Sequence, residues 1–154
     1  MRHRLVTKPI RASALALLIA AGCTSIQVQP IDPSLAPKYI CIEQNPAVQV
    51  ADFVEVIRAR LSYHGIRTDV FSGAASARCQ YVLTYTALRS WDLTPYMSHA
   101  EVYLSHDGRQ VAAGTFHLRG KGGYALTKYD STKKKMDPVI DQLIGAAPTG
   151  GNAQ

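Results

Sequence analysis

The stretch "SHAEVYLSHDGRQVAAGTFHL", residues 98–118, carries the clearest folding signal in the chain. Asp107 and Gly108 stand between two segments in which apolar and polar side chains alternate. An Asp-Gly pair in this setting favours a type I′ turn and therefore a tight two-residue hairpin. Counted outward from that turn, Leu104 pairs with Val111, and one face of the hairpin is apolar.

The histidines of this hairpin invite a metal or catalytic hypothesis. His99 and His117 are neighbours across the two strands, but the count from the turn places them on opposite faces of the sheet. They would share a metal only if a bulge shifted the register. The sequence therefore predicts no metal site, and no cofactor is expected.

Three strands and a helix are predicted before the hairpin. Residues 39–44 and 66–72 are rich in β-branched and aromatic residues, and residues 79–91 predict a long third strand. Between the first two strands, residues 49–64 have apolar side chains at helical spacing, and Gly65 follows. These apolar residues are Val50, Phe53, Val54, Ile57 and Leu61.

A second helix is predicted at the end of the domain. Asp137 is a good N-cap and Pro138 is tolerated at the first helical position. The predicted order is therefore β-α-β-β-β-β-α. Such a chain predicts an α+β fold, in which two helices pack on one face of a largely antiparallel sheet.

The N-terminal segment has the features of a secretory signal. Four basic residues precede an uncharged run of ten residues, 12–21, which is too short for a spanning helix of about 20 residues. The run ends in Ala20, Ala21, Gly22 and Cys23, and this ending resembles the bacterial lipobox. The resemblance implies removal of residues 1–22, acylation of Cys23 and, because Thr24 follows, an outer-membrane destination.

Removal of the signal changes the charge of the protein. The full chain has 17 Lys and Arg against 11 Asp and Glu, but four of the basic residues lie in residues 1–22. The remaining 13 against 11 leave a net charge of +2, so a basic nucleic-acid binder is disfavoured. We expect a proline-rich linker over residues 23–38, one domain over 39–146 and a disordered tail over 147–154.

Two cysteines remain once Cys23 carries lipid. Cys41 and Cys79 would lie in an oxidising compartment, where a disulfide between them is expected. The alternative is a pair of buried free thiols.

A basic segment is the first candidate binding surface. Six basic residues lie between 119 and 135 against a single Asp, and the last three lysines are expected to precede the second helix. The six are Arg119, Lys121, Lys128, Lys133, Lys134 and Lys135. They would suit anionic lipid, lipopolysaccharide phosphates or an acidic protein. The alternative is an ordinary solvated loop.

Aromatic residues on the long third strand are the second candidate surface. Tyr81, Tyr85 and Trp91 share one parity and could line an exposed face. The alternative is that this side of the strand packs in the core.

Catalytic motifs are absent from the sequence. There is no Gly-x-Ser-x-Gly motif, and "RGKGGYALTK" (119–128) lacks the Walker pattern. No enzyme activity is therefore predicted.

Four segments, "LTYTALRSWD" (83–92), "HAEVYL" (99–104), "LRGKGG" (118–123) and "KMDPVID" (135–141), resemble a family of small proteobacterial periplasmic lipoproteins of uncharacterised function. The resemblance implies a single lipid-anchored domain in the cell envelope. We expect a binding or scaffolding module, whose partner is an envelope protein or an anionic lipid. The alternatives are a carrier of a small or lipidic ligand and, more remotely, a hydrolase.

Overall fold

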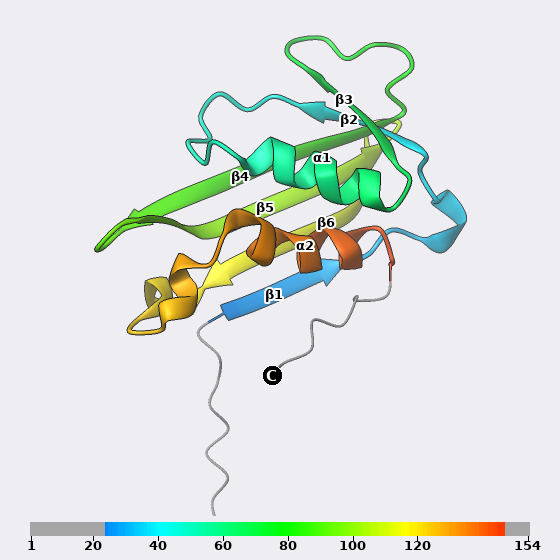
Figure 1. Cartoon of the computed structure of the whole chain (residues 1–154). Coiled ribbons are helices and arrows are strands. Elements are labelled where there is room, and N and C mark those ends of the chain that lie inside the picture. The colour runs from blue at the N-terminus through cyan, green and yellow to red at the C-terminus, as the bar shows by residue number, and fades with distance from the viewer. Residues whose placement is uncertain (1–23, 147–154) are drawn as a thin grey trace, which may run out of the picture.

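The domain is a six-stranded sheet with two helices on one face (Figure 1). The computed structural model describes residues 24–146. The strands are β1 (Thr24–Gln29), β2 (Tyr39–Glu43), β3 (Arg67–Phe71), β4 (Tyr81–Trp91), β5 (Pro95–His106) and β6 (Arg109–Leu118). The helices are α1 (Phe53–Tyr63) and α2 (Thr132–Leu143), with 3-10 turns η1 (Pro33–Leu35), η2 (Arg119–Gly122) and η3 (Leu126–Tyr129).

The sheet order is β1-β6-β5-β4-β2-β3. β2 pairs in parallel with both β3 and β4, and the other neighbours are antiparallel. The β2-α1-β3 unit is parallel because the helix carries the chain back across the sheet before the next strand begins. The predicted α+β fold, with two helices on a largely antiparallel sheet, is confirmed.

The core lies between the sheet and the helices. Phe53, Ile57 and Leu61 of α1 are fully buried, as the helical spacing predicted. The fully buried side chains of α2 include Val139, Ile140 and Leu143. The helix packs very closely against the sheet, because a Cβ on Gly114 of β6 would lie 2.8 Å from Cγ1 of Val139. A larger residue at position 114 would therefore push α2 away.

The predicted linker over residues 23–38 is wrong for residues 24–29. Residues 24–29 form an edge strand instead, paired antiparallel with the end of β6. Ile26 and Val28 pack against the core, while the prolines begin only at position 30, beyond the strand. Ile31 is then buried and its N–H donates to the carbonyl of Leu143. Among the described residues, the folded domain therefore begins at Thr24, while the signal 1–22, Cys23 and the tail 147–154 lie outside them.

The hairpin turn forms where the sequence predicted it. Asp107 and Gly108 both have positive φ, 48° and 76°, as a type I′ turn requires. The register shifts just beyond the turn, however, because Ser105 pairs with Gln110 while Leu104 pairs with Ala112. The extra residue forms a bulge, so the predicted pairing of Leu104 with Val111 is wrong.

The second helix starts earlier than predicted. Ser131 is the N-cap, and its hydroxyl accepts a hydrogen bond from the N–H of Lys134 at 3.2 Å. Pro138 therefore lies inside α2 and forgoes one helical hydrogen bond. Burial of the first turn explains the outcome, since Lys135 and Met136 both pack into the interior.

Cys41 and Cys79 form a disulfide, as expected, with a Cα–Cα distance of 5.6 Å. The bond ties β2 to the segment that enters β4, and it closes a loop with a sequence separation of 38.

Replacing both Cys41 and Cys79 by Ala should lower the free energy of unfolding by about 3–4 kcal/mol, because the unfolded chain regains the entropy of the open loop. Urea denaturation of the two proteins measures the difference. A reducing agent should destabilise the native protein and leave the double variant unchanged. Two free thiols in the native protein, detected by non-reducing mass spectrometry, would contradict the pairing.

Candidate functional site

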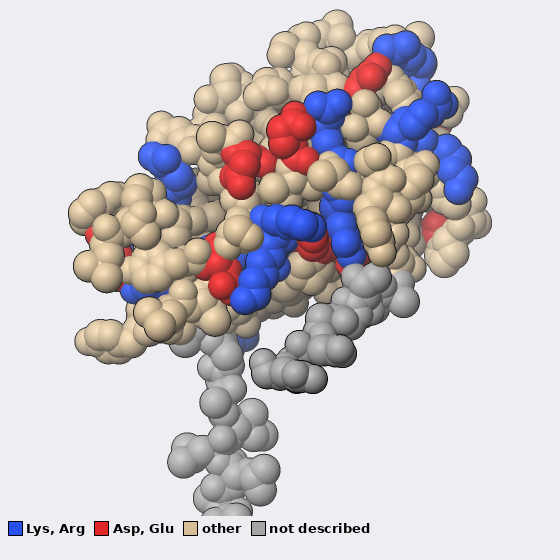
Figure 2. Space-filling view, in the orientation of Figure 1, with Lys and Arg blue, Asp and Glu red and all other residues tan. Residues whose placement is uncertain are grey.

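The six basic residues of the candidate anionic-surface contact do not form one surface. In Figure 2, lysine and arginine side chains are interspersed with acidic ones on the face that carries the helices. Lys128 and Lys135 are only 7% and 4% exposed. They therefore cannot contact a membrane or a partner protein, and their assignment to that surface is wrong.

The buried amino groups of these two lysines instead fix the segment between β6 and α2 to β5 and to the turn that precedes it. The Nζ of Lys135 donates to the carbonyls of Met97 and Lys128, at 2.9 and 2.5 Å, and burial lowers its pKa. The Nζ of Lys128 forms an ion pair with Asp92 and donates to the carbonyl of Gly123 at 2.9 Å. The bond to Asp92 raises the pKa of Lys128, so this lysine remains charged.

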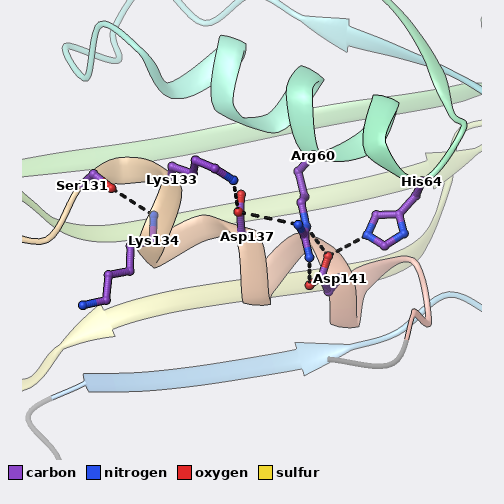
Figure 3. A network of polar contacts seen from close by, with 7 residues as sticks. All are labelled: Arg60, His64, Ser131, Lys133, Lys134, Asp137 and Asp141. Atoms are coloured by element: carbon purple, nitrogen blue, oxygen red, sulfur yellow. Dashed lines mark hydrogen bonds and ion pairs between the residues drawn. The ribbon is translucent and has the colours of Figure 1, made fainter. Parts of the chain in front are cut away.

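The other four basic residues are exposed. Lys133 and Lys134 lie on α2 and form ion pairs with Asp137 and Asp130, one helical turn away. Figure 3 shows the first of these pairs. Arg119 and Lys121 both lie in η2, directly after β6, and neither forms an ion pair with another described residue. These two cations alone among the six keep their charge uncompensated within the described part of the chain.

The three aromatic residues of β4 do not share an exposed face. Tyr85 is buried under α1, with its ring 5.2 Å from that of Phe53. Tyr81 donates its hydroxyl proton to the carbonyl of Leu35 at 2.7 Å. Trp91 is 75% exposed, and it lies beyond a register shift at Leu88. The predicted aromatic face is wrong, and its alternative, packing in the core, holds for Tyr81 and Tyr85.

A buried charge network joins the two helices (Figure 3). The guanidinium of Arg60 on α1 binds both carboxylate oxygens of Asp141 on α2, and the Nε2 of His64 lies 2.8 Å from the same carboxylate. Burial alone would raise the pKa of Asp141, but the hydrogen bonds from Arg60 and His64 outweigh it and hold that pKa below its ordinary value. Asp141 is therefore ionised at neutral pH and fixes α2 to α1.

The bulge brings His99 and His117 together on the face of the sheet that the helices leave open. They are direct partners, and their Nδ1 atoms lie 3.2 Å apart, so the prediction that they face opposite sides is wrong. The Nε2 of His99 also lies 3.1 Å from Glu101, which accepts a hydrogen bond from Tyr103 at 2.8 Å. The bond from Tyr103, with a smaller effect from His99, lowers the pKa of Glu101.

The row contains metal-ligand residue types, but not in the arrangement of a metal centre. No three histidine, cysteine or acidic residues within 24–146 are arranged to hold an ion. A hollow of about 390 Å³ adjoins the pair and is lined by Ser25, Gln27, His99, Thr115, His117 and Arg119. The site therefore offers hydrogen bonds to a partner on an open face of the sheet.

A second hollow, of about 610 Å³, lies beside α1 and β3. Three arginines line it, Arg58, Arg67 and Arg78, and the first and last pair with Glu55 and Asp69. Its lining is mostly polar, which differs from the deep apolar cavity that a lipid carrier requires.

Sequence reasoning missed an exposed apolar cluster at one end of the domain. Trp91, Leu93, Tyr124 and Leu126 are between 75% and 105% exposed. All four carried a signal that could have been used, since each stands next to a turn-forming residue, namely Asp92, Gly123 or Thr127. Within the described chain, neither helix has the length and apolar character needed to cross a bilayer.

Comparison with known proteins shows similarity at the level of the fold. No protein-family model matches the chain, and no curated protein matches it in sequence. The dodecamer of a PelC point variant from Paraburkholderia phytofirmans is 16% identical, with a TM-score of 0.54, and the match covers 80% of this chain and 99% of that chain.

Two further solved structures are more distant. The PelC dodecamer from the same organism is 13% identical, with a TM-score of 0.48, over 76% of this chain and 97% of that chain. A minor lipoprotein from Acinetobacter baumannii is 19% identical, with a TM-score of 0.27, over 69% and 85% of the two chains. The first match shows that this α+β domain has a fold found in PelC.

Replacing Lys135 by Glu should lower the free energy of unfolding by about 3 kcal/mol or more, because a buried carboxylate would face two carbonyl oxygens. Lys134→Glu is the matched control on the same helix. It should cost about 0.3–0.5 kcal/mol through repulsion from Asp130 one turn away. Urea denaturation compares the two, and equal losses would contradict the burial of Lys135.

Replacing Asp141 by Asn should cost about 3 kcal/mol at pH 7, because the buried guanidinium of Arg60 would lose its bidentate carboxylate and keep the looser ion pair with Asp137 at 3.8 Å. Asp130→Asn, which breaks an exposed pair, should cost at most about 1 kcal/mol.

The stability that Asp141→Asn removes should depend on pH. The folded-state pKa of Asp141 lies below its unfolded value of about 3.9, so its contribution is complete above that pH and disappears as the pH falls through the folded-state pKa. Urea titrations from pH 7 downward should therefore show the native protein and Asp141→Asn converging in acid. A constant difference down to the acid limit would contradict this account.

Proposed function

We propose that this protein is a lipid-anchored binding or scaffolding module at the periplasmic face of the bacterial outer membrane. Acyl chains on Cys23 would hold it there, and the uncovered face of the sheet would bind its partner. The uncovered face is the observation that supports a binding role, because both helices of the described chain pack on the opposite face (Figure 1).

The chemistry of this face suits a protein partner. Its centre carries His99, Glu101, Tyr103 and Thr86, which combine an aromatic ring with hydrogen-bonding groups. Glu101 is already oriented by two hydrogen bonds, so little side-chain entropy would be lost on binding. Tyr103 adds to these hydrogen-bonding groups a residue type that is enriched in protein–protein interfaces.

The anchor is supported by the position of Cys23. It follows three small residues at the end of an apolar run and directly precedes β1. One acyl chain binds a membrane only weakly, whereas two or more hold a protein there stably. The lipid would therefore supply the membrane affinity and leave the sheet face available for recognition.

The fold that PelC shares bears on how scaffolding would be achieved. PelC forms a dodecamer, and self-assembly of this chain through the uncovered face is one form of the proposed role. The experiment therefore has to distinguish a second copy from another envelope protein.

A photo-crosslinking amino acid in place of Thr86, on the uncovered face, should give a discrete adduct in living cells. The matched control is the same amino acid in place of Glu55, whose exposed side chain lies on α1. An adduct of twice the mass of the chain indicates self-assembly, and another mass identifies an envelope partner by mass spectrometry. Absence of any adduct at Thr86, or equal adducts at both positions, would contradict a role for this face.

The anchor is tested in the same cells. Cys23→Ser should move the protein out of the membrane fraction, because the acylated thiol is lost. A Cys23→Ser protein that stays membrane-bound after processing would contradict lipid anchoring.

A further inference from the structure

One end of the sheet gathers segments that are distant in sequence. Thr24, the first residue of β1, pairs with Leu118, the last residue of β6. Trp91, the last residue of β4, pairs with Pro95, the first residue of β5. Because β5 and β6 are antiparallel neighbours, the β4–β5 turn, the η2–η3 segment and the start of β1 lie at the same end, on the left in Figure 1. We call it the anchor end, since Cys23 is bonded directly to Thr24.

The anchor end carries the most exposed large apolar side chains among the described residues. Trp91 and Leu93, at 75% and 85% exposed, come from the β4–β5 turn. Tyr124 and Leu126, at 105% and 81%, come from the η2–η3 segment. The remaining exposed apolar residues of residues 24–146 are Tyr63, Val70 and Leu88, at 66%, 38% and 58%. Four exposed bulky residues at one end mark a contact surface.

The two apolar loops are held together by Lys128. Its Nζ binds Asp92, which stands between Trp91 and Leu93, and also the carbonyl of Gly123, next to Tyr124. The hydroxyl of Tyr96 donates to the carbonyl of Lys121 at 3.0 Å and fixes the same segment to β5. The buried lysine therefore presents both loops as one preformed surface.

The charge of the anchor end fits an anionic bilayer. Arg119 and Lys121 are exposed there and have no acidic partner in the described part of the chain. Basic residues near a membrane surface are attracted to anionic headgroups, and Trp and Tyr prefer the headgroup level of a bilayer. An end with bulky apolar tips and free cations thus matches the interface of a lipid membrane.

The distance to the lipid completes the argument. No residue separates the acylated cysteine from Thr24, the first residue of β1, and one extended residue spans at most about 3.6 Å. With residues 24–29 folded into the sheet, no spacer lifts the domain from the membrane. The anchor end is therefore the part of the domain that the lipid brings to the bilayer.

We infer that the anchor end inserts into the surface of an anionic lipid bilayer through Trp91, Leu93, Tyr124 and Leu126, with Arg119 and Lys121 at the headgroups. This inference rests on the proposed anchor at Cys23. It orients the domain with its strands rising from the membrane. The hairpin turn at Asp107 and Gly108 then points away, and the uncovered face stays accessible from the side.

The single tryptophan of the chain reports on this insertion directly. The full lipidated protein is reconstituted in vesicles of phosphatidylethanolamine and phosphatidylglycerol, with or without lipids brominated on their acyl chains. Trp91 emission should shift to shorter wavelength, and brominated lipid should quench it. Leu93→Ser combined with Leu126→Ser should reduce this quenching at least twofold. The control is Tyr63→Ser, which removes an exposed aromatic side chain at the C-terminal end of α1 and should leave the quenching unchanged.

The outcomes separate the anchor from the insertion. A protein that floats with the vesicles, while Trp91 is unquenched by brominated lipid and open to aqueous acrylamide, has its anchor but contradicts insertion. Trp91 shielded from both quenchers would also overturn the inference and assign the anchor end to a protein contact. A protein that fails to float contradicts the anchor of the proposed function and insertion with it.

Discussion

The antiparallel pairing of β1 with β6 is the constraint on which the rest of the structure depends. It places the first described residue beside Leu118, at the end of the sheet that carries the exposed apolar residues. It also leads the chain to Ile31, whose N–H donates a hydrogen bond to the carbonyl of Leu143 at the end of α2. Because β1 occupies the sheet edge and contacts α2, the N-terminal segment becomes part of the core. The pairing therefore decides both how the helix is seated and which end of the domain faces the proposed lipid.

Three charged groups that resemble surface residues in the sequence have structural roles. Lys135 donates to two carbonyls of neighbouring segments, and Lys128 joins the β4–β5 turn to the η2–η3 segment. Asp141 joins α2 to α1, and its contacts with Arg60 and His64 keep it ionised. Each buried charge has partners, as burial at this depth requires. The surface that remains for binding is consequently smaller and less basic than composition suggests.

The two proposed contacts of the domain occupy different parts of it. Membrane contact uses one end of the sheet, where bulky apolar side chains project from turns. Partner recognition uses the uncovered face, where the bulge beyond the hairpin turn aligns His99 with His117 beside Glu101. A domain that stands on its end leaves that face free, so anchoring and recognition do not compete.

The sequence by itself determined the features that local chemistry controls. Helical spacing identified α1, Asp107 and Gly108 identified the turn, and the pattern of elements predicted the α+β class. Only the tertiary structure decided the bulge, the start of α2 at Ser131, the strand at residues 24–29 and the burial of Lys128 and Lys135. Each of these depends on partners distant in sequence. A register shift by one residue moves every side chain of a strand to the other face of the sheet. A lysine is buried only where carbonyl or carboxylate oxygens can accept hydrogen bonds from its amino group. No short stretch of sequence contains that information.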